Sequence, residues 1–457
     1  MNIKTRFAPS PTGLMHLGNA RTALFNALYA YHHGGKFLLR IEDTDLERSQ
    51  SALAIQLMED LQWLNITWQE GAYYQSRRGE IYAKYYAQLE RQGNTYPCFC
   101  TPQELALSRK LQRASGQAPR YAGTCAHLSE AEVADKIEQG LKPTLRFRVQ
   151  RGQLIDFDDL VKGQQHFVGD YIGDFIIRRA DGTPAFFFCN AVDDALMGVT
   201  QVFRGEDHLT NTPRQLLILQ ALGLSMPQYG HISLILGHDG APLSKRNGSQ
   251  SIQDLRQNGF LADGVVNYLA RLGHSYIEDD YLSRQQLSAQ FSIKRLGRAP
   301  ARFDEQQLRH WQHLAISKTD ESQIWTWMGE AVHKLVPETV RSQFVATIQP
   351  NITYPKDALD WAKILFTDEL KREADAEAEI AKAGNDFFCH SWAALEASQA
   401  DFKALVKEVK QRTGKKGKNL FMPLRAALTG KTHGPEMADI LHLMGIERAR
   451  GRLSVLK

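Results

Sequence analysis

The stretch that decides the fold of this chain is residues 2–42, NIKTRFAPSPTGLMHLGNARTALFNALYAYHHGGKFLLRIE. Residues 2–8 place apolar side chains two steps on either side of a central threonine, a spacing that predicts a short strand. Residues 17–31 carry apolar side chains at helical spacing, and Gly34 follows where a helix commonly ends. Residues 36–41 are mostly apolar and predict a buried strand. A strand, a helix and a second strand within about 40 residues indicate a right-handed βαβ unit with parallel strands.

The rest of the chain predicts an interrupted α/β domain followed by helices. Residues 91–182 are polar and irregular, so we interpret them as an insertion and not as a continuation of the sheet. The α/β character returns over residues 186–236, whereas strand patterns nearly disappear after residue 248. The expected fold class is therefore α/β followed by all-α, with a split parallel sheet. Further strands are expected at 143–149, 174–178 and 199–204, and further helices at 213–222 and 371–383.

The composition excludes several classes of protein. Of the 457 residues, 43% are hydrophobic and 23% are charged, which is ordinary for a globular chain and unlike a collagen-like or disordered one. No apolar run approaches the roughly 20 residues that span a bilayer, and the first residues lack the apolar segment of a secretory signal. Five cysteines are a low, odd number that favours a reducing compartment. We therefore expect a cytoplasmic protein without a membrane segment.

Positive charge is concentrated toward the C-terminal end. The net charge of the chain is +4, yet residues 401–457 hold 13 Lys and Arg against 5 Asp and Glu, a local charge of +8. A basic segment on a mildly acidic remainder is consistent with a polyanion that binds at that end. A solvated basic helix face would produce the same pattern, so the charge alone leaves both interpretations open.

The first motif that suggests chemistry is PSPTGLMHLGN at residues 9–19. It lies between the first strand and the first helix, at the carboxyl edge of a parallel sheet, where such sheets bind ligands. A helix N-terminus offers free N–H groups and partial positive charge to a phosphate. His16 stands at that helix start, and Gly18 would let a ligand approach the backbone. A capping loop with an exposed histidine is the alternative interpretation.

The second motif is DGAPLSKRNG at residues 239–248, a glycine-bounded loop. It presents a hydroxyl, Ser244, beside two adjacent cations, Lys245 and Arg246. Lys245 could neutralise the charge that develops on a triphosphate as it is displaced. A solvated surface turn is the alternative, and the ten residues alone do not decide between the two.

Taken together, the two motifs resemble the HIGH and KMSKS motifs of the class I aminoacyl-tRNA synthetases, at residues 16–19 and 242–246. The chain is more closely similar to the bacterial glutamyl-tRNA synthetases. Four further stretches carry that resemblance over nearly the whole chain: RFAPSPTG from Arg6, LLRIEDTD from Leu38, VFRGEDHLTNTPRQ from Val202 and LFMPLRAALTG from Leu420.

The resemblance implies an enzyme that uses ATP with Mg²⁺ to activate L-glutamate and transfer it to tRNA-Glu, as a monomer. His16 and Lys245 would be the catalytic residues. The residues that would bind ATP are Thr12, His16, Gly18, Asn19, Ser244, Lys245 and Arg246. Three alternatives stay open: a synthetase that charges tRNA-Gln as well or instead, a truncated paralogue that modifies a tRNA base, and a catalytically silent RNA-binding protein.

The glutamate site can be compared with the chemistry of the substrate. Glutamate brings two carboxylates and an ammonium, which call for guanidinium groups and an anion respectively. Arg6, Glu42 and Arg204 each end a predicted strand, at the ligand-binding edge. By similarity, Arg6 and Arg204 would bind the side-chain carboxylate and Glu42 the ammonium, although a single arginine at a strand end is more often a surface ion pair. The other expected lining residues are Ala8, Ser10, Phe186 and Asn190.

Two departures from the family pattern concern the same region. The family usually has a pocket tyrosine where this chain has Phe186, so one hydrogen bond to the substrate would be missing. The family also usually has two lysines where this chain has Ala241 and Pro242, which lowers the positive charge of the second loop.

The resemblance also divides the chain into five parts. Residues 1–88 and 186–248 would be the two halves of a Rossmann-like catalytic domain, and residues 89–185 an insertion that binds the tRNA acceptor stem. Residues 249–312 would be a helical stem-contact domain, and residues 313–457 a helical anticodon-binding region. Two basic segments of that last part, 403–418 and 425–452, fit contact with phosphates.

A possible metal site lies in the insertion. Cys98 and Cys100 are followed, after 24 intervening residues, by Cys125 and then by His127. Thiolates and imidazole suit a tetrahedral, structural zinc ion that could staple an irregular insertion. Related enzymes use a tyrosine ligand in some cases, which makes Tyr121 a competitor to His127. Buried free thiols are the alternative to a zinc site.

Overall fold

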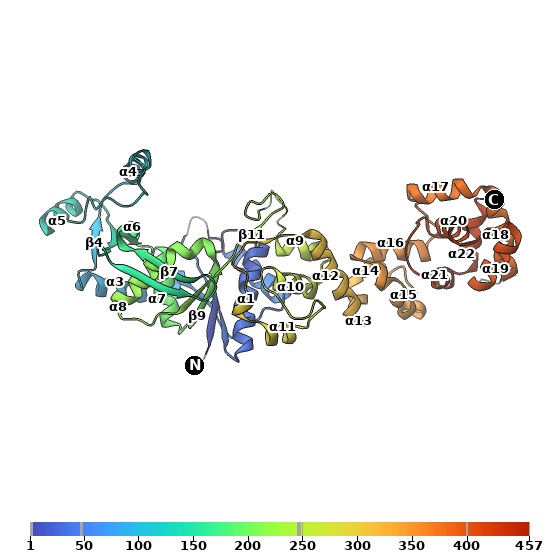
Figure 1. Cartoon of the computed structure of the whole chain (residues 1–457), viewed down its shortest axis with the longest axis horizontal. Helices are drawn as coiled ribbons and strands as arrows, with labels where there is room; N and C mark the ends of the chain where they lie inside the picture. The colour runs from blue at the N-terminus through green and yellow to red at the C-terminus, as the bar shows by residue number, and fades with distance from the viewer. Residues whose placement is uncertain (1–2, 46–48, 245–247, 249, 399–400, 457) are drawn as a thin grey trace. The chain divides into compact units, whose positions relative to one another are not determined.

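A computed structural model describes residues 3–45, 49–244, 248, 250–398 and 401–456 (Figure 1). The chain divides into two compact units, each with its own hydrophobic core. The first unit comprises Met1–Leu255 and Val266–Glu305, and the second comprises Arg256–Val265 and Gln306–Lys457.

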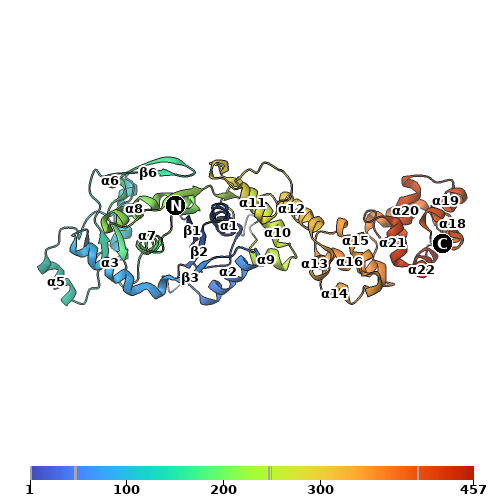
Figure 2. The same ribbon diagram turned by 90° about the horizontal axis from the view of Figure 1, so that it is seen from below.

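The predicted βαβ unit is confirmed at the start of the first unit. Strands β1 (Lys4–Phe7) and β2 (Lys36–Ile41) are parallel, and α1 (Leu17–His32) connects them. After α2 (Ser51–Trp63), strand β3 (Glu70–Tyr74) pairs parallel to β2 and completes a sheet of order β1-β2-β3. Figure 2 shows these three strands side by side, with α1 next to β1 and β2. The carboxyl ends of the parallel strands therefore share one edge.

A second parallel pair continues from β1. Strands β9 (Gln201–Gly205) and β10 (Gln228–Ile232) are parallel, and α8 (Thr212–Leu222) connects them, which confirms the predicted strand and helix. The backbone N–H of Thr200 donates to the carbonyl of Lys4 at 2.8 Å, so β9 begins beside β1. The carboxyl end of β9 thus lies at the same edge as those of β1 and β2.

Asn26 on α1 joins the two strand pairs. Its side-chain nitrogen donates to the carbonyl of Phe203 on β9 at 2.9 Å, and its side-chain oxygen accepts from the Phe203 N–H at 3.4 Å. The hydroxyl of Thr5 on β1 donates to the backbone carbonyl of Asn26 at 2.8 Å. Because all three residues are buried, this amide supplies hydrogen bonds that water cannot replace.

The insertion contains an antiparallel sheet and a separate hairpin. Its sheet has the order β4-β5-β8 and includes strands at both predicted places. Its helices α4 and α5 each begin with a capping box and bury no side chain completely. The elements are β4 (Thr95–Cys98), α4 (Pro102–Ala114), α5 (Glu130–Glu138), β5 (Thr144–Phe147), β6 (Leu154–Asp159), β7 (Gly163–Val168), α6 (Gly169–Ile172) and β8 (Phe175–Arg178). On either side of the insertion lie α3 (Gly79–Arg91) and α7 (Phe186–Leu196).

The rest of the first unit is mainly helical, as predicted, with one exception. The two-residue strand β12 (Ala301–Arg302) pairs parallel to β11 (Ile235–Leu236). Two residues are too few for a periodic pattern, so the sequence did not indicate this strand. The helices are α11 (Arg284–Gln290), which lies wholly in this unit, and α9 (Ile252–Gln257) and α10 (Ala262–Arg271), each of which has residues in both units.

The second unit is built of helices around one hydrophobic core that includes Phe344, Trp361 and Leu424. The predicted helix at 371–383 is present as α17. Among the described residues of the whole chain, no helix combines the length and apolar character needed to cross a membrane. The helices are α12 (Glu305–Lys318), α13 (Glu321–Met328), α14 (Glu330–His333), α15 (Arg341–Ile348), α16 (Pro355–Phe366), α17 (Ala374–Ala383), α18 (Asn385–Ser398), α19 (Phe402–Thr413), α20 (Lys418–Thr429), α21 (Met437–Met444) and α22 (Ile446–Ser454).

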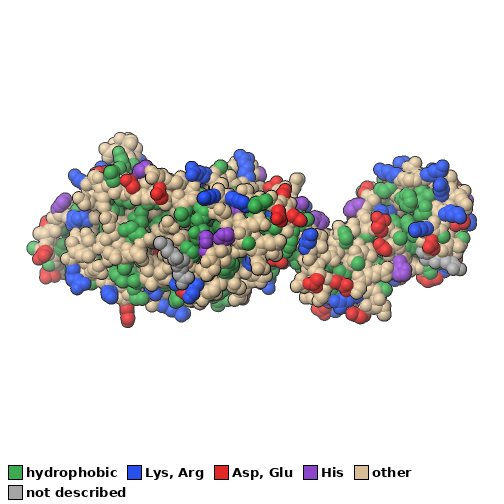
Figure 3. All heavy atoms as spheres, turned by 60° about the horizontal axis from the view of Figure 1, so that its bottom comes forward, with side chains coloured by type: hydrophobic (Ala, Val, Ile, Leu, Met, Phe, Trp, Pro, Cys, Tyr) green, Lys and Arg blue, Asp and Glu red, His purple; other side chains and the backbone are tan. Residues whose placement is uncertain are grey.

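The basic residues of this unit have two different roles. Arg425, Arg448 and Arg452 donate to backbone carbonyls, those of Pro435, Leu365 and Thr367 among them. Arg452 is buried, so the expectation that the 425–452 segment as a whole faces phosphates is wrong for this residue. Figure 3 shows other Lys and Arg side chains on the outer surface of the unit. The lysines exposed to solvent include 403, 407, 410, 415, 416 and 418.

We predict that Asn26→Leu lowers the stability of the first unit. The substitution leaves the buried N–H and carbonyl of Phe203 without their side-chain partner, which should cost about 2 to 4 kcal/mol. Amide hydrogen exchange of the β9 segment measures the change. Gln62→Leu, which removes an exposed amide on α2, is the control and should leave exchange in β9 unchanged. Equal exchange in both variants would contradict the role assigned to Asn26.

Candidate active site at the carboxyl end of the parallel strands

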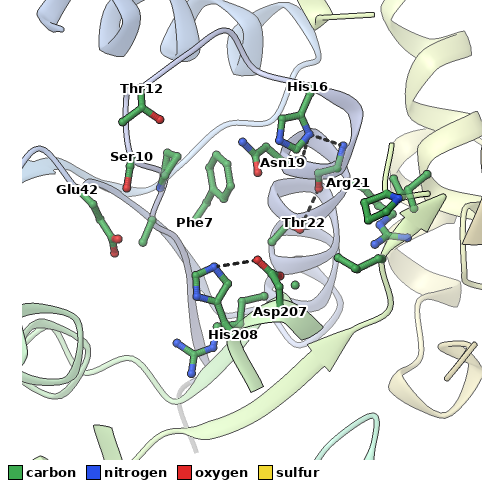
Figure 4. A pocket seen from close by; sticks show the side chains of 18 of the residues that line it. Phe7, Ser10, Thr12, His16, Asn19, Arg21, Thr22, Glu42, Asp207 and His208 are labelled. Atoms are coloured by element: carbon green, nitrogen blue, oxygen red, sulfur yellow. Dashed lines mark hydrogen bonds and ion pairs between the residues drawn. The ribbon is translucent and has the colours of Figure 1, made fainter. Parts of the chain in front are cut away.

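A cavity of about 440 Å³ opens at the shared carboxyl edge of β1, β2 and β9. Figure 4 shows side chains from the loop after β1, from the end of β2 and from the segment after β9 around the same space. The two loops singled out in the sequence meet here, because Pro242 and Leu243 of the second loop also line the cavity. Eleven of the predicted site residues line it: Arg6, Ala8, Ser10, Thr12, His16, Gly18, Asn19, Glu42, Phe186, Asn190 and Arg204.

His16 caps the first helix. Its Nδ1 accepts from the backbone N–H groups of Gly18 at 3.1 Å and Asn19 at 3.4 Å. This role assigns the ring proton to Nε2, which is then the available donor. Burial lowers the pKa of His16, an effect that nearby Asp207 partly opposes, so the neutral ring is favoured. The histidine is therefore both an N-terminal cap and a lining residue of the cavity, which combines the two interpretations of the first motif.

A glycine at position 18 has a further structural reason. A Cβ there would lie 3.0 Å from Cε1 of His16, so the glycine makes room for the capping imidazole. Whether it also lets a ligand approach the backbone stays a prediction.

The second loop is held at its base. The N–H of Leu243 donates to the carbonyl of Ile235 at 2.8 Å, and the N–H of Gly237 donates to the carbonyl of Ala241 at 2.8 Å. Ser244 is exposed and does not line the cavity. Lys245 and Arg246 lie outside the described residues, so their expected contacts with ATP stay predictions.

Beneath the cavity lies Arg40, a buried charge that the sequence reasoning missed. Its guanidinium donates to Oδ1 of Asp194 at 2.7 Å and to Oδ1 of Asn190 at 3.0 Å. It also lies 3.4 Å from Oε1 of Glu42. Arg6 shares the same Asp194 oxygen, at 3.3 Å. A fully buried arginine in an apolar strand was the available signal, because such a residue requires charged partners.

The two carboxylates of this cluster respond differently to burial. Burial raises the pKa of Glu42, although Arg40 and Arg6 oppose the change. Burial would also raise the pKa of Asp194, but the guanidinium groups of Arg40 and Arg6 outweigh it and the pKa is lowered. Asp194 is thus ionised and pairs with both arginines, whereas a further positive charge in the cavity would stabilise the ionised form of Glu42.

Arg204 is a buried cation of the cavity wall. Its Nε donates to Nε2 of His231 at 3.2 Å, and its Nη2 donates to Oγ1 of Thr212 at 2.7 Å. Among the residues that the structure describes, Nη1 is buried without a hydrogen-bond partner, and no carboxylate pairs with the side chain. Burial lowers the pKa of Arg204 to about 10. Such a group is strongly stabilised by an anion in the cavity.

The buried charges next to the cavity are more positive than negative. Arg6 and Arg40 pair with Asp194, and Arg40 also lies beside Glu42, whereas Arg204 and Arg21, which is buried in the same wall, have no ion pair among the described residues. A ligand with two carboxylates and one ammonium supplies the missing negative charge and also places a cation near Glu42. The electrostatics of the cavity therefore fit an acidic amino acid.

Phe186 forms an apolar part of the cavity wall. Its ring lies against His208, with 5.4 Å between the ring centroids. Burial, and then the charge of Arg204, lower the pKa of His208 to about 4, so this ring is neutral. His208 and the neighbouring Asp207 also line the cavity and were not named in the sequence reasoning, although both belong to the quoted stretch from Val202.

Three of the four residues predicted to hold a metal ion come together. The sulfur atoms of Cys98, Cys100 and Cys125 lie within 4.8 Å of one another, and His127 is not in this group. The hydroxyl of Tyr121 lies 3.3 Å from the Cys98 sulfur and 3.4 Å from the Cys100 sulfur. The prediction of His127 as the fourth ligand is therefore not supported, and the competing residue, Tyr121, is in place.

The reason is local geometry around the tyrosine ring. The guanidinium of Arg146 lies 3.7 Å from the centre of the Tyr121 ring, which holds the ring over the sulfurs. The backbone N–H of Cys125 donates to the Tyr121 hydroxyl at 2.9 Å. Three converging thiols and a phenol oxygen are a donor set that zinc accepts.

The parallel sheet, the histidine-capped helix and the cationic cavity define a catalytic domain of the class I tRNA synthetase type. The family described as "tRNA synthetases class I (E and Q), catalytic domain" matches residues 2–310, and the family "Anticodon binding domain" matches residues 307–456.

Individual relatives extend this result over the full length. "Glutamate--tRNA ligase 1" of Methylococcus capsulatus is 55% identical over 460 residues, covering 99% of this chain and 98% of the relative. "Glutamate--tRNA ligase 2" of Coxiella burnetii is 50% identical over 460 residues, covering 99% of both. The crystal structure of a glutamate-tRNA synthetase from Elizabethkingia anophelis matches with a TM-score of 0.88 at 26% identity, over 100% of this chain and 99% of that one. The chain therefore belongs to the glutamate–tRNA ligase family of class I tRNA synthetases.

We predict that Asp194→Asn destabilises the first unit. Removal of this charge leaves Arg40 and Arg6 buried beside an amide, which should lower the free energy of unfolding by about 3 to 5 kcal/mol. Amide hydrogen exchange of the β2 segment measures the loss. Asp279→Asn changes an exposed carboxylate of the same unit and should have no measurable effect. Unchanged exchange in Asp194→Asn would show that this carboxylate does not hold the arginines.

Proposed function

We propose that this protein is a glutamate–tRNA ligase that uses ATP with Mg²⁺ to attach L-glutamate to tRNA-Glu. The observation that carries the proposal is the unmatched guanidinium of Arg204, whose Nη1 is buried at the cavity without a partner among the described residues. The side-chain carboxylate of glutamate would bind Arg204 and Arg6, and the ammonium would bind Glu42. Ala8, Ser10, Phe186 and Asn190 would complete the site.

The reaction would proceed in two steps. The α-carboxylate of glutamate attacks the α-phosphorus of ATP in line, a phosphorus–oxygen bond forms, and pyrophosphate leaves with the electrons of the broken bond. A hydroxyl of the terminal adenosine of tRNA then attacks the carbonyl carbon of the mixed anhydride, and AMP leaves. Positioning and charge stabilisation suffice for such chemistry.

This chain's own groups would supply most of that stabilisation. The start of α1 offers free N–H groups, and His16 offers an Nε2–H to phosphate oxygens at the same helix end. Thr12, Gly18 and Asn19 would line the nucleotide. Ser244, Lys245 and Arg246 would approach it from the second loop. Bound Mg²⁺ would neutralise phosphate charge.

We assign residues 1–88 and 186–248 to the catalytic domain, and the remaining parts of the chain to tRNA binding. Residues 89–185 would bind the acceptor stem, and residues 249–312 would make a further contact with the stem. Residues 313–457 would bind the anticodon, a role supported by the matching anticodon-binding family and by the exposed lysines between 403 and 418. We also propose a cytoplasmic, monomeric enzyme.

A second candidate function is the charging of tRNA-Gln. It is favoured by Phe186, which removes a hydroxyl that the family usually has in this wall.

Charging of purified tRNAs tests both candidates. We expect the protein to glutamylate tRNA-Glu. Arg204→Gln should raise the KM for glutamate at least 100-fold, because the substrate carboxylate loses the buried guanidinium that would bind it. Lys356→Gln, a change on α16 in the second unit, is the control and should leave the KM for glutamate unchanged. Charging of tRNA-Gln alone would favour the second candidate, and absence of charging with every tRNA would refute the proposal.

We further propose that Cys98, Cys100, Cys125 and Tyr121 hold a structural zinc ion. The purified protein should contain about one zinc per chain, and Cys125→Ser should lose it. Tyr121→Phe should weaken zinc binding, whereas His127→Ala should not. Metal analysis and competition with a chelator measure both effects.

Cys389→Ser, at an exposed cysteine of the second unit, is the control and should retain zinc. Zinc loss in His127→Ala with full retention in Tyr121→Phe would contradict the assignment of the fourth ligand.

A further inference from the structure

Behind Arg204 lies a buried pair of side chains that the proposed chemistry does not use. Nδ1 of His231 on β10 lies 2.5 Å from Oδ2 of Asp159, and both side chains are completely buried. Asp159 is the last residue of β6, so it comes from the hairpin of the insertion and not from the catalytic sheet. The pair therefore connects the two parts of the first unit directly beside the cavity.

Asp159 is held rigidly. Its Oδ1 accepts from the backbone N–H groups of Val161 at 2.9 Å, Lys162 at 2.8 Å and His231 at 3.1 Å. Burial would raise the pKa of Asp159, but the hydrogen bonds from His231 and Lys162 outweigh it and the pKa is lowered. An ionised carboxylate is an acceptor only, so the proton between the two side chains belongs to Nδ1 of His231.

This assignment determines the other end of the imidazole. Nε2 of His231 lies 3.2 Å from Nε of Arg204, and arginine has donors only. Nε2 must therefore carry the lone pair, and the ring must be neutral with its proton on Nδ1. Burial lowers the pKa of His231, and Arg204 lowers it further, although Asp159 opposes the change.

The contacts also orient the guanidinium plane. Thr212 accepts from Nη2 of Arg204 at 2.7 Å, and its hydroxyl lies 3.1 Å from Nε2 of His231. Because Nε and Nη2 of Arg204 both donate hydrogen bonds, two bonds along one edge of the guanidinium fix the orientation of its plane. Nη1 is then the nitrogen of Arg204 that has no hydrogen-bond partner among the described residues, on a side chain that lines the cavity.

We propose that Asp159 and His231 are positioning residues that orient Arg204 toward the substrate carboxylate, through a chain from Asp159 to His231 to Arg204. This inference rests on the proposed function, because it assigns the carboxylate of glutamate to Arg204. It makes the insertion hairpin part of the amino-acid site. The hairpin is anchored there independently, since the N–H of Leu160 donates to the carbonyl of Tyr229 at 2.8 Å and Lys162 pairs with Glu206.

The chain of contacts predicts which kinetic constant changes. A guanidinium that loses its acceptor at Nε can rotate away from the carboxylate, which weakens glutamate binding and leaves the ATP site intact. The KM for glutamate should therefore rise while the KM for ATP and the kcat at saturating glutamate stay near their original values. A purely structural role would reduce kcat through loss of folded enzyme, with the KM for glutamate unchanged.

The experiment compares three substitutions of His231 in the full-length enzyme. His231→Leu removes both contacts and should raise the KM for glutamate about 10- to 100-fold. His231→Gln can place an amide oxygen near the position of Nε2, so it should restore most of the affinity. His231→Asn can donate to Asp159 but does not reach Arg204, so it should resemble His231→Leu.

The hairpin supplies a matched control. His166 and Asp156 form a second histidine–aspartate pair, 2.9 Å apart, on the same hairpin but largely exposed to solvent. Asp156→Asn and His166→Leu should leave the KM for glutamate unchanged, whereas Asp159→Asn should raise it.

Several outcomes would overturn the inference: a KM for glutamate within twofold of the original in His231→Leu, a change confined to kcat, or equal rescue by Asn and Gln. Where His231→Leu does not fold, His231→Gln and Thr212→Val decide, because Thr212→Val should raise the same KM through loss of the Nη2 contact. Failure of the proposed function has a different signature, since the unsubstituted protein would then glutamylate no tRNA, and the inference would fall with it.

Discussion

The arrangement of charge at the carboxyl edge of the sheet is the constraint on which the rest of the site depends. Three guanidinium groups, those of Arg6, Arg40 and Arg204, lie out of water beside two buried carboxylates. Burying charge is costly unless each group has a partner, so the sequence must provide Asp194 and Asn190 for the first two. The third is held only by neutral acceptors, and in the proposed function the carboxylate of the substrate would be its counter-charge.

That arrangement also shows which segments of the chain contribute charged residues to the cavity. The parallel strands bring the first two arginines and Glu42 to one edge, and the inserted hairpin contributes Asp159 behind the third arginine. The insertion is therefore more than a surface that binds another molecule, because its Asp159 contacts His231, which in turn contacts Arg204 in the wall of the cavity. In the proposed function, this contact would connect the amino-acid site to the segment that binds the acceptor stem.

Much of this could be predicted from the sequence. The βαβ unit was predictable because hydrophobic periodicity over residues 17–31 and the flanking apolar runs are strong signals. The gathering of Arg6, Glu42 and Arg204 was predictable because parallel strands end at a common edge. Arg40 and Asp194 were missed because nothing in a single sequence shows that two charged residues within apolar segments face each other. The strand at Ala301–Arg302 was missed because two residues carry no period.

By itself, the amino-acid sequence determined the class of fold, the family and eleven of the residues that surround the cavity, since these depend on local periodicity and on short motifs in a fixed order. Only the tertiary structure decided which buried polar and charged groups have a hydrogen-bond partner or a counter-charge and which have none. Tyr121 lies over the cysteines because Arg146 holds its ring there, and Arg204 lacks a counter-charge because its neighbours are a histidine and a threonine from other elements. Both facts depend on distances between residues far apart in the chain, which spacing along the sequence does not encode.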